Sequence, residues 1–285
     1  MPSRLTIRAM TRPELDTLVD WATAEGWNPG LHDAQIFWDT DPEGFVAAEL
    51  DGELIGGGSI IAYARRFGFM GFFIIRSDYR SQGLGRQLWQ ARRDSLIARL
   101  DPPAVIGMDG VFTMQDFYAR GGFVFSHRDL RFEGVGVAAS PDPRLVDLSA
   151  VNFAELLRYD AAHFPAPRET FLRAWIAQPG SRALGVLENN ALQGYGVIRP
   201  CRRGFKIGPL FAADAERAEA LFLGLSDHAR GEPLFLDVPE NNAEALALAA
   251  RHELREVFGC ARMYLGPAPR LPGGEVFGVT TFELG

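Results

Sequence analysis

The amino-acid sequence predicts a mixed α/β protein made of two similar units, each a sheet flanked by helices. Two observations carry this prediction. The chain has 285 residues, and globular domains usually contain roughly 100–200 residues, so two domains are expected. Strand-like and helix-like patterns also follow one another in the same order in both halves of the chain.

The first unit begins with a strand and two helices. Residues 5–10 alternate apolar and polar side chains, as a half-buried strand does. Thr11 and Glu14 stand at the spacing of a capping box, so a helix is expected from there to Gly26. A second, short helix is predicted over residues 33–38.

Three strands and a long helix come next. Asp51 and Gly52 form a dipeptide typical of a tight turn between two strands. Residues 67–76 form a continuous apolar strand, and a polar turn with two glycines follows it. The helix after this turn repeats a small or apolar residue every three or four positions: Leu84, Leu88, Ala91 and Ser95.

The first unit ends with a strand over residues 104–110, a short helix over 113–122 and a strand over 123–134. The next ten residues are small, contain Gly and Pro, and lack periodicity, which predicts a linker. The same order of elements then repeats. We therefore expect three segments: a first domain over residues 1–135, a linker over 136–143 and a second domain over 144–285.

The composition limits the class of partner. The net charge is −7 and no basic stripe is present, which argues against nucleic acid. No apolar run reaches the roughly 20 residues of a membrane span, and the first residues lack the apolar core of a secretion signal. A cytoplasmic protein without a membrane partner is expected. Neither the two cysteines nor the five histidines show metal-ligand spacing, so no metal is predicted.

The glycine-bearing turn before the long helix is the candidate binding site. Free amides and the dipole at a helix start attract an anion, and glycines at 83 and 85 let a phosphate approach the backbone. P-loop and dinucleotide patterns are excluded, because the chain has no Gly-Lys pair and no third glycine at the required position. A turn that merely needs glycine conformations is the alternative.

This stretch, FFIIRSDYRSQGLGRQLW, resembles the acyl-CoA-binding motif of the GNAT superfamily of N-acyltransferases. The matching residues are Ile75, Tyr79, Arg80, Gly83, Gly85 and Leu88. Ser77 stands where the family usually has proline. The segment FYARGGF (117–123) resembles a second family motif. The resemblance implies mostly antiparallel mixed sheets and acetyl-CoA, or another acyl-CoA, as co-substrate.

The resemblance also implies roles for individual residues. The backbone of Phe73, Ile74 and Ile75 is expected along the pantetheine arm. The expected pyrophosphate contacts are Arg80, Ser81, Gln82, Gly83, Leu84, Gly85 and Arg86. Tyr118 is expected to protonate the departing thiolate, with Asp109 as the candidate general base and His127 as a weaker one. A packed aromatic residue and a turn aspartate are the alternatives for Tyr118 and Asp109.

Acceptor selectivity in the family usually comes from the loop between the first two helices. Trp27, His32, Asp33 and Trp38 in that region are expected to bind the amine-bearing substrate, with core packing as the alternative for the tryptophans. The acceptor is expected to be an amine on a small molecule or a protein, and the chain to be a monomer or homodimer.

The second unit resembles the family only in its later part, at Asn242, Ala245 and Leu248. It has no matching glycine turn, and acidic residues such as Asp214 and Glu216 stand where phosphates would bind. A degenerate second domain is therefore expected. Three functions stay open: transfer of an acetyl group to a primary amine by direct attack in a ternary complex, a non-catalytic acyl-CoA-binding sensor, and a purely structural pair of domains.

Overall fold

The computed structural model describes residues 4–140 and 142–285; residues 1–3 and 141 lie outside the described part, the last of them within the predicted linker. The first half contains β1 (Leu5–Ala9), α1 (Arg12–Ala24), α2 (Asp33–Thr40), β2 (Phe45–Leu50), β3 (Glu53–Tyr63), β4 (Phe67–Ile75), α3 (Leu84–Arg99), β5 (Ile106–Val111), α4 (Gln115–Arg120) and β6 (Val124–Val135).

The second half repeats this order. It contains β7 (Leu145–Asp147), α5 (Phe153–His163), α6 (Glu169–Ile176), β8 (Arg182–Glu188), β9 (Ala191–Pro200), β10 (Phe205–Ala212), α7 (Ala215–Ser226), β11 (Pro233–Pro239), α8 (Ala243–Arg251), β12 (Arg255–Leu265) and the short β13 (Val276–Gly278). The predicted fold class and the predicted order of elements are therefore confirmed.

Local sequence features form the caps and turns that they predict. The Thr11 amide donates to the Glu14 carboxylate over 2.8 Å at the start of α1, completing a capping box. Asp51 and Gly52 both have positive φ, at 51° and 89°, as the tight hairpin turn between β2 and β3 requires. One detail differs: Ser95, expected on the buried face of α3, is exposed, and Arg92 is buried there instead.

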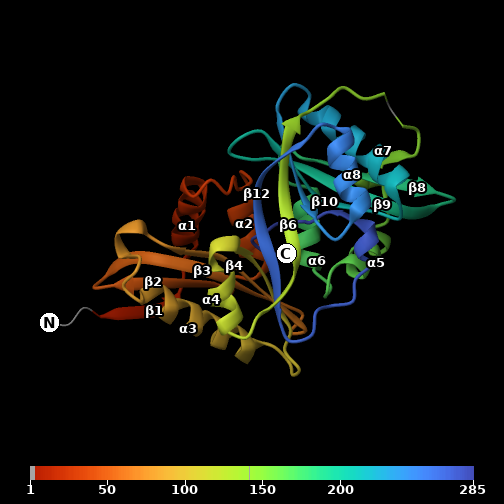
Figure 1. The fold of residues 1–285 in the computed structure, drawn as a ribbon. Coiled ribbons are helices and arrows are strands. Elements are labelled where there is room, and N and C mark those ends of the chain that lie inside the picture. Colours follow the sequence, from red (N-terminus) through yellow and green to blue (C-terminus); the bar gives the residue numbers. More distant parts are fainter. Residues whose placement is uncertain (1–3, 141) are drawn as a thin grey trace.

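All described strands belong to one sheet, in the order β1-β2-β3-β4-β5-β12-β6-β11-β10-β9-β8-β7, with β13 paired to β10. Only the pairs β4–β5 and β10–β11 are parallel among the described strands. Figure 1 shows β6 and β12 running side by side through the centre of the molecule, between the two halves.

The two halves exchange strands at this centre. β12, from the second half, pairs with β5 of the first half, and β6, from the first half, pairs with β11 of the second. β6 and β12 also pair with each other. Each half-sheet is thus completed by a strand of the other half, so the two repeated units share one framework. The predicted domain boundaries stay a prediction, because the sheet does not divide at the linker.

Each half contains one place where parallel strands part. In the first half, β4 and β5 pair from Gly68 to Met70 and then separate. The register of β4 against β3 shifts just beyond this point, and Phe72 has a φ of 48°, a conformation that bulges a strand. The backbone of β4 is thereby turned away from β5, leaving a gap in the sheet.

The matching gap in the second half is filled by the chain itself. β10 and β11 pair from Phe205 to Ile207. Beyond that, β13 pairs with β10 through Leu210 and Phe211, and the Val279 amide donates to the Asp237 carbonyl of β11 over 2.9 Å. Phe277 of β13 is wholly buried in the second-half core. The last strand therefore bridges β10 and β11.

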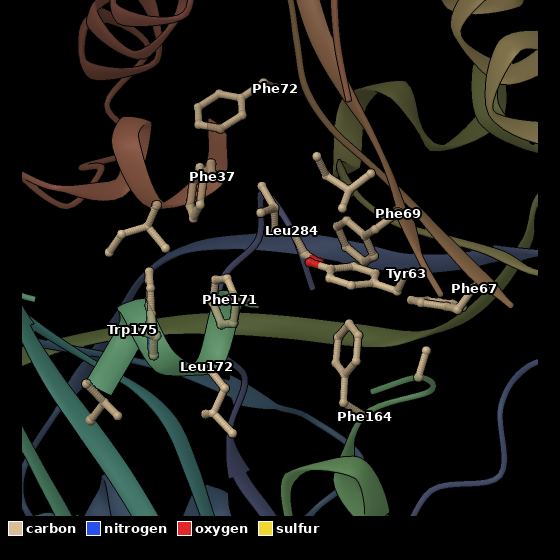
Figure 2. Close-up of a cluster of buried hydrophobic side chains, with 14 of the residues drawn as sticks. Phe37, Tyr63, Phe67, Phe69, Phe72, Phe164, Phe171, Leu172, Trp175 and Leu284 are labelled. Atoms are coloured by element: carbon tan, nitrogen blue, oxygen red, sulfur yellow. The ribbon is translucent and has the colours of Figure 1, made fainter. Parts of the chain in front are cut away.

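The largest hydrophobic cluster spans both halves. In Figure 2, Phe37 of the first half lies next to Phe171 and Trp175 of the second, and Tyr63 and Phe67 lie next to Phe164. Phe37 stacks on Trp175 with 6.2 Å between ring centroids. Two further clusters lie between α3 and the first half-sheet and between α7 and the second. No helix of the described residues is long and apolar enough to cross a membrane.

Residues 279–285, here called the closing segment, run through this shared core and are all buried. The Ser59 hydroxyl contacts the Glu283 carbonyl at 3.3 Å, and the Tyr63 hydroxyl donates to the Leu284 carbonyl over 3.0 Å. Figure 2 shows Leu284 between the aromatic rings of the two halves. The closing segment thus ties β3 of the first half to the second half.

Candidate functional site

A cleft of about 440 Å³ lies where β4 and β5 separate, beside the start of α3. One wall is Phe73, Ile74 and Ile75 of β4. The other wall comes from residues after β5 and from α4: Val111, Thr113, Met114 and Tyr118. Arg80, Ser81 and Gly85 of the glycine turn close one end. The separation of the two strands therefore leaves the edge of β4 facing an open, elongated space.

The glycine turn places free amides at the end of this cleft. Gly83 has a φ of 79° and Ser81 one of 63°, so the backbone curls through two left-handed residues before α3 begins. The first helical hydrogen bond of α3 runs from the Gln87 amide to the Gly83 carbonyl at 3.4 Å. The amides of residues 84–86 therefore have no acceptor within the helix and are available to an anion.

Gly85 keeps this helix start accessible. A Cβ at this position would lie 3.5 Å from the Ile75 side chain and 3.6 Å from the Phe73 ring, which are ordinary contacts. A larger side chain would extend into the cleft that Gly85 lines. The glycine is thus needed for access to the amides and not for the fold of the turn.

Arg80 is held at the cleft by two contacts. Its Nε donates to the Ile75 carbonyl over 2.8 Å, and its Nη2 forms an ion pair with Glu25 at the end of α1. Both Arg80 and Glu25 line the cleft. The guanidinium is therefore positioned at the end of the cleft beside the start of α3, paired with the Glu25 carboxylate.

A smaller cavity of about 50 Å³ continues from the cleft through the gap in the sheet. Trp27, Phe73, Val111 and Tyr118 line both spaces. On the α3 side the cavity is lined by Trp89 and Arg92. On the opposite side it is lined by Asp109 of β5, by Phe258 and Cys260 of β12, and by Phe282 and Glu283 of the closing segment. The cavity thus has aromatic walls, with Arg92 on one side of the sheet and Asp109 and Glu283 on the other.

Tyr118 stands at the junction of the cleft and the cavity. Its side chain is 4% exposed, and burial raises its pKa well above the usual value, partly offset by the charge of Arg92. The phenol is therefore protonated at neutral pH. Its hydroxyl makes no hydrogen bond to a described side chain, which leaves the proton available to a bound molecule.

Asp109 lies in a buried acidic cluster shared by three strands. Arg262 of β12 contacts both of its oxygens, at 2.6 and 2.7 Å, and reaches Asp129 of β6 at 3.3 Å. Burial raises the pKa of Asp109 to about 8, with Arg262 opposing the rise and Asp129 adding to it. Two carboxyl groups thus share one guanidinium, and a proton on Asp109 relieves their repulsion.

Asp129 contacts both Arg262 of this cluster and His127. Burial alone would raise the pKa of Asp129, but Arg262 and His127 outweigh it and the pKa is lowered. The His127 Nε2 lies 3.5 Å from the Asp129 carboxylate. His127 lines a separate crevice between the halves and does not line the cavity. The structure therefore places it behind Asp129, away from the gap in the sheet.

Cations of β6 and of the second half hold the loop between α1 and α2. Arg131 of β6 donates to the Trp27 carbonyl over 2.6 Å, and Lys206 of β10 donates to the Asn28 carbonyl over 3.1 Å. Asp33 pairs with Arg199 of β9 at 3.1 Å, and neither side chain is exposed. The loop that covers one side of the cavity is thus fixed by β6 and by two strands of the second half.

The closing segment forms another wall of the cavity. The guanidinium of Arg131 lies over the rings of Phe258 and Phe282, 5.6 and 4.9 Å from their centroids. Glu283 is 3% exposed, and its Oε2 has no hydrogen-bond partner among the described residues. Both Phe282 and Glu283 line the cavity. The second half thus contributes four of the fifteen residues that line the cavity.

The structure brings several of the sequence-predicted site residues together. Phe73, Ile74, Ile75, Arg80, Ser81 and Gly85 line the cleft, Asp109 lines the cavity, and Tyr118 and Trp27 line both. Gln82 and Gly83 are exposed at the turn, Leu84 packs in the core under α3, and Arg86 lines a neighbouring surface hollow.

The other residues expected to contact substrate lie elsewhere. Asp33 is buried in its ion pair with Arg199 and lines neither the cleft nor the cavity. Trp38 stacks on Phe45 with 5.9 Å between centroids. His32 is half-buried outside the cavity walls. Packing against the second half and the core accounts for these positions.

Residues of the site that the sequence did not reveal come from both halves. Those used in the argument below are Arg92 of the first half and Phe258, Cys260, Arg262, Phe282 and Glu283 of the second. Only Arg92 carried a local signal, since it stands four residues from both Leu88 and Leu96 on the buried helix face. Across the described ranges 4–140 and 142–285, no group of three or more His, Cys, Asp or Glu is arranged to hold a metal ion.

Comparison with known families gives a match in each half. A profile described as Acetyltransferase (GNAT) family matches residues 12–123, and one described as Acetyltransferase (GNAT) domain matches residues 156–278. Among curated proteins, a holothin acyltransferase from Pseudoalteromonas sp. (strain SANK 73390) is 25% identical over 283 residues, covering 98% of this chain and 94% of that protein.

Solved structures share the fold. A putative acetyltransferase from Pyrococcus horikoshii aligns with a TM-score of 0.84 at 23% identity, over 99% of this chain and 96% of that one. A tandem GNAT protein from the clavulanic acid biosynthesis pathway aligns with a TM-score of 0.63 at 14% identity, over 93% of this chain and 100% of that one. The paired arrangement of units is thus found in other proteins.

Proposed function

Because the chain is a tandem acyl-CoA-dependent N-acyltransferase of the GNAT family, with one GNAT domain in each half, we propose that its first half transfers an acyl group to a primary amine held in the cavity. The amine attacks directly while both substrates are bound. The observation that carries this proposal is the passage through the sheet: the cleft and the cavity share Trp27, Phe73, Val111 and Tyr118.

The cleft suits the acyl-CoA. Free amides and glycines at the start of α3 suit the pyrophosphate, which needs donors and close backbone approach. The unpaired edge of β4 at Phe73–Ile75 offers backbone groups to an extended amide-containing arm, since pairing to a strand edge satisfies such groups. A β4 amide near the bulge is the donor for the oxyanion that develops on the thioester.

The cavity suits the amine and its proton. Asp109 and Glu283 offer carboxyl oxygens to the amino group on the side away from α3. Asp109 takes the proton of the amine as the new C–N bond forms, and Tyr118 gives its proton to the sulfur as the C–S bond breaks. The aromatic walls favour a small amine that the enclosed space can accept. Acetyl-CoA is the reference donor.

The second half is proposed to bind no acyl-CoA of its own. β13 pairs with β10 in the gap where the first half has its cleft. Asp214 and Glu216 also stand at the start of α7, where they oppose a phosphate. The second half is instead proposed to shape the amine site through Phe258, Phe282 and the loop contacts already described.

The test is calorimetric titration of the full chain with acetyl-CoA, followed by CoA-release assays over a panel of primary amines. We expect one acetyl-CoA per chain and release with at least one amine, reduced about 10²–10³-fold in kcat/KM by Tyr118→Phe. Binding without turnover on any amine would favour the second candidate, an acyl-CoA-binding sensor. A stoichiometry of two would contradict the role given to β13, and no binding would contradict the whole proposal.

A further inference from the structure

Arg92 of α3 is a buried cation without an anion. Its side chain is 1% exposed, and its Nη2 donates to the Ser59 and Gly71 carbonyls over 2.6 and 2.5 Å. Its Nε and Nη1 are buried and have no hydrogen-bond partner among the described residues. Burial lowers its pKa to about 10, so it is charged at neutral pH.

The other fully buried arginines of the described chain differ in this respect. Each of them forms an ion pair with a carboxylate: Arg131 with Asp237, Arg168 with Asp160, and Arg199 with Asp33. Burying a charge without a counter-ion costs free energy. The missing carboxylate at Arg92 therefore indicates that a bound anion completes the site.

The position of Arg92 assigns that anion to one substrate. Arg92 lines the cavity on the α3 side, with Trp89 and Tyr118, and the cleft also lies beside α3. Asp109 and Glu283 line the opposite side of the sheet, where their carboxyl oxygens accept hydrogen bonds from the amine. An anionic group at Arg92 is therefore on the side of the acyl donor and away from the amine.

We propose that the transferred acyl group carries a carboxylate at its far end, so that the donor is the CoA half-thioester of a short dicarboxylic acid. This inference rests on the proposed function. The cavity of about 50 Å³ has room for roughly three to five water-sized groups, since one water needs about 10–15 Å³. A carboxylate with one methylene group and the amino group of the acceptor together fill that space.

The transfer itself is unchanged by this carboxylate. The amine nitrogen forms a bond to the thioester carbon, the C–S bond breaks, Asp109 receives the proton from nitrogen, and the sulfur gains a proton from Tyr118. The far carboxylate keeps its charge and accepts hydrogen bonds from the two unpaired donors of Arg92. A charged pair of this kind selects strongly against an uncharged chain of similar length.

Arg92 also supports the β4 bulge through its bonds to Ser59 and Gly71. If Arg92 only supported the bulge, its substitution would change the affinity for every acyl-CoA by the same factor. The bulge lies beside the proposed thioester position, which all acyl-CoA molecules share. A role in recognising a carboxylate affects only the charged donors. The ratio of affinities for a charged and an uncharged donor therefore separates the two roles.

The experiment is calorimetric titration of the full chain with succinyl-CoA, malonyl-CoA and butyryl-CoA, which needs no knowledge of the amine. We expect the wild-type chain to bind succinyl-CoA or malonyl-CoA at least about 10-fold more tightly than butyryl-CoA. Arg92→Met is expected to abolish this preference, and Arg92→Lys to keep part of it. Arg120→Met removes an exposed charge on α4 and is expected to leave the preference unchanged.

Equal or tighter binding of butyryl-CoA by the wild-type chain overturns the inference, whatever the variants do, and leaves the proposed function standing. A preference that survives in a folded Arg92→Met variant also overturns it, because another group then recognises the carboxylate. Failure to bind any of the three thioesters would instead remove the proposed function itself.

Discussion

At the scale of single residues, the site depends on charged groups placed where water cannot screen them. Asp109 and Asp129 share Arg262 in a buried cluster, and the proximity of the two carboxyl groups holds a proton on one of them. The resemblance to the GNAT family predicted Asp109, at the end of the fifth strand, as a candidate base. It could not predict Arg262, because that residue reaches Asp109 only through the exchange of β12.

The raised pKa of Asp109 predicts a pH dependence. Because the folded-state pKa is about 8, the carboxyl is protonated below that pH and cannot accept the proton of the amine. With Asp109 as the base, kcat/KM is expected to rise about tenfold per pH unit up to about pH 8 and then level off. Asp109→Asn is expected to lower kcat/KM about 10²–10⁴-fold and to remove this rise.

Steady-state CoA release between pH 6 and 9.5 checks this expectation. Asp116→Asn, which removes an exposed carboxyl from the first turn of α4, is the matched control and should keep the rise. Ionisation of the amine substrate would leave the rise in all three proteins. A slope that persists in Asp109→Asn would therefore assign the base to another group.

At the scale of elements, the start of α3 is predicted to hold the pyrophosphate through backbone amides. Gly85→Val places two methyl groups in the cleft, while the backbone at this position is helical and accepts valine at little cost. The affinity for acetyl-CoA is expected to fall at least about tenfold, or about 1.4 kcal/mol, with little change in Tm. Calorimetry and thermal unfolding of the same samples measure both quantities.

Ala215→Val, at the start of α7, is the control in the second half and should bind acetyl-CoA as the wild-type chain does. An unchanged affinity in Gly85→Val would contradict the site assignment, even with the fold intact. A loss of affinity in Ala215→Val would show that the second half takes part in binding.

Local pattern was sufficient to predict the elements themselves. Capping residues, hairpin dipeptides and apolar periodicity act within a few residues of one another, so Thr11, Asp51 and the α3 stripe predict structure directly. Arg92 on that stripe shows what local pattern cannot predict. Periodicity places position 92 on the buried face of α3, but the reason for a cation there is the gap between β4 and β5, which the sequence does not reveal. The filling of the second gap by β13 depends on contacts that are distant in sequence.

At the scale of the whole molecule, the halves are joined in three ways. β6 and β12 are exchanged, the closing segment crosses between them, and one aromatic cluster contains residues of both (Figure 2). Sequence alone predicted two consecutive units, because each repeat looks complete along the chain. Which strand completes which half-sheet depends on contacts between residues far apart in the sequence, such as Arg262 of β12 with Asp109 of β5 and Arg131 of β6 with Asp237 of β11.

This sharing predicts that the halves unfold together. Trp175, wholly buried on α6, stacks on Phe37 of the first half, so Trp175→Ala should cost roughly 3–5 kcal/mol. Each half-sheet includes a strand of the other half, so neither half is expected to unfold alone. The destabilisation by Trp175→Ala should therefore lower a single Tm for the whole chain. In the wild-type chain and the variant, the calorimetric and van't Hoff enthalpies are expected to agree. Acetyl-CoA should raise that single Tm. Two separate transitions, with only the first shifted by acetyl-CoA, would mean that the exchanged strands do not couple the halves.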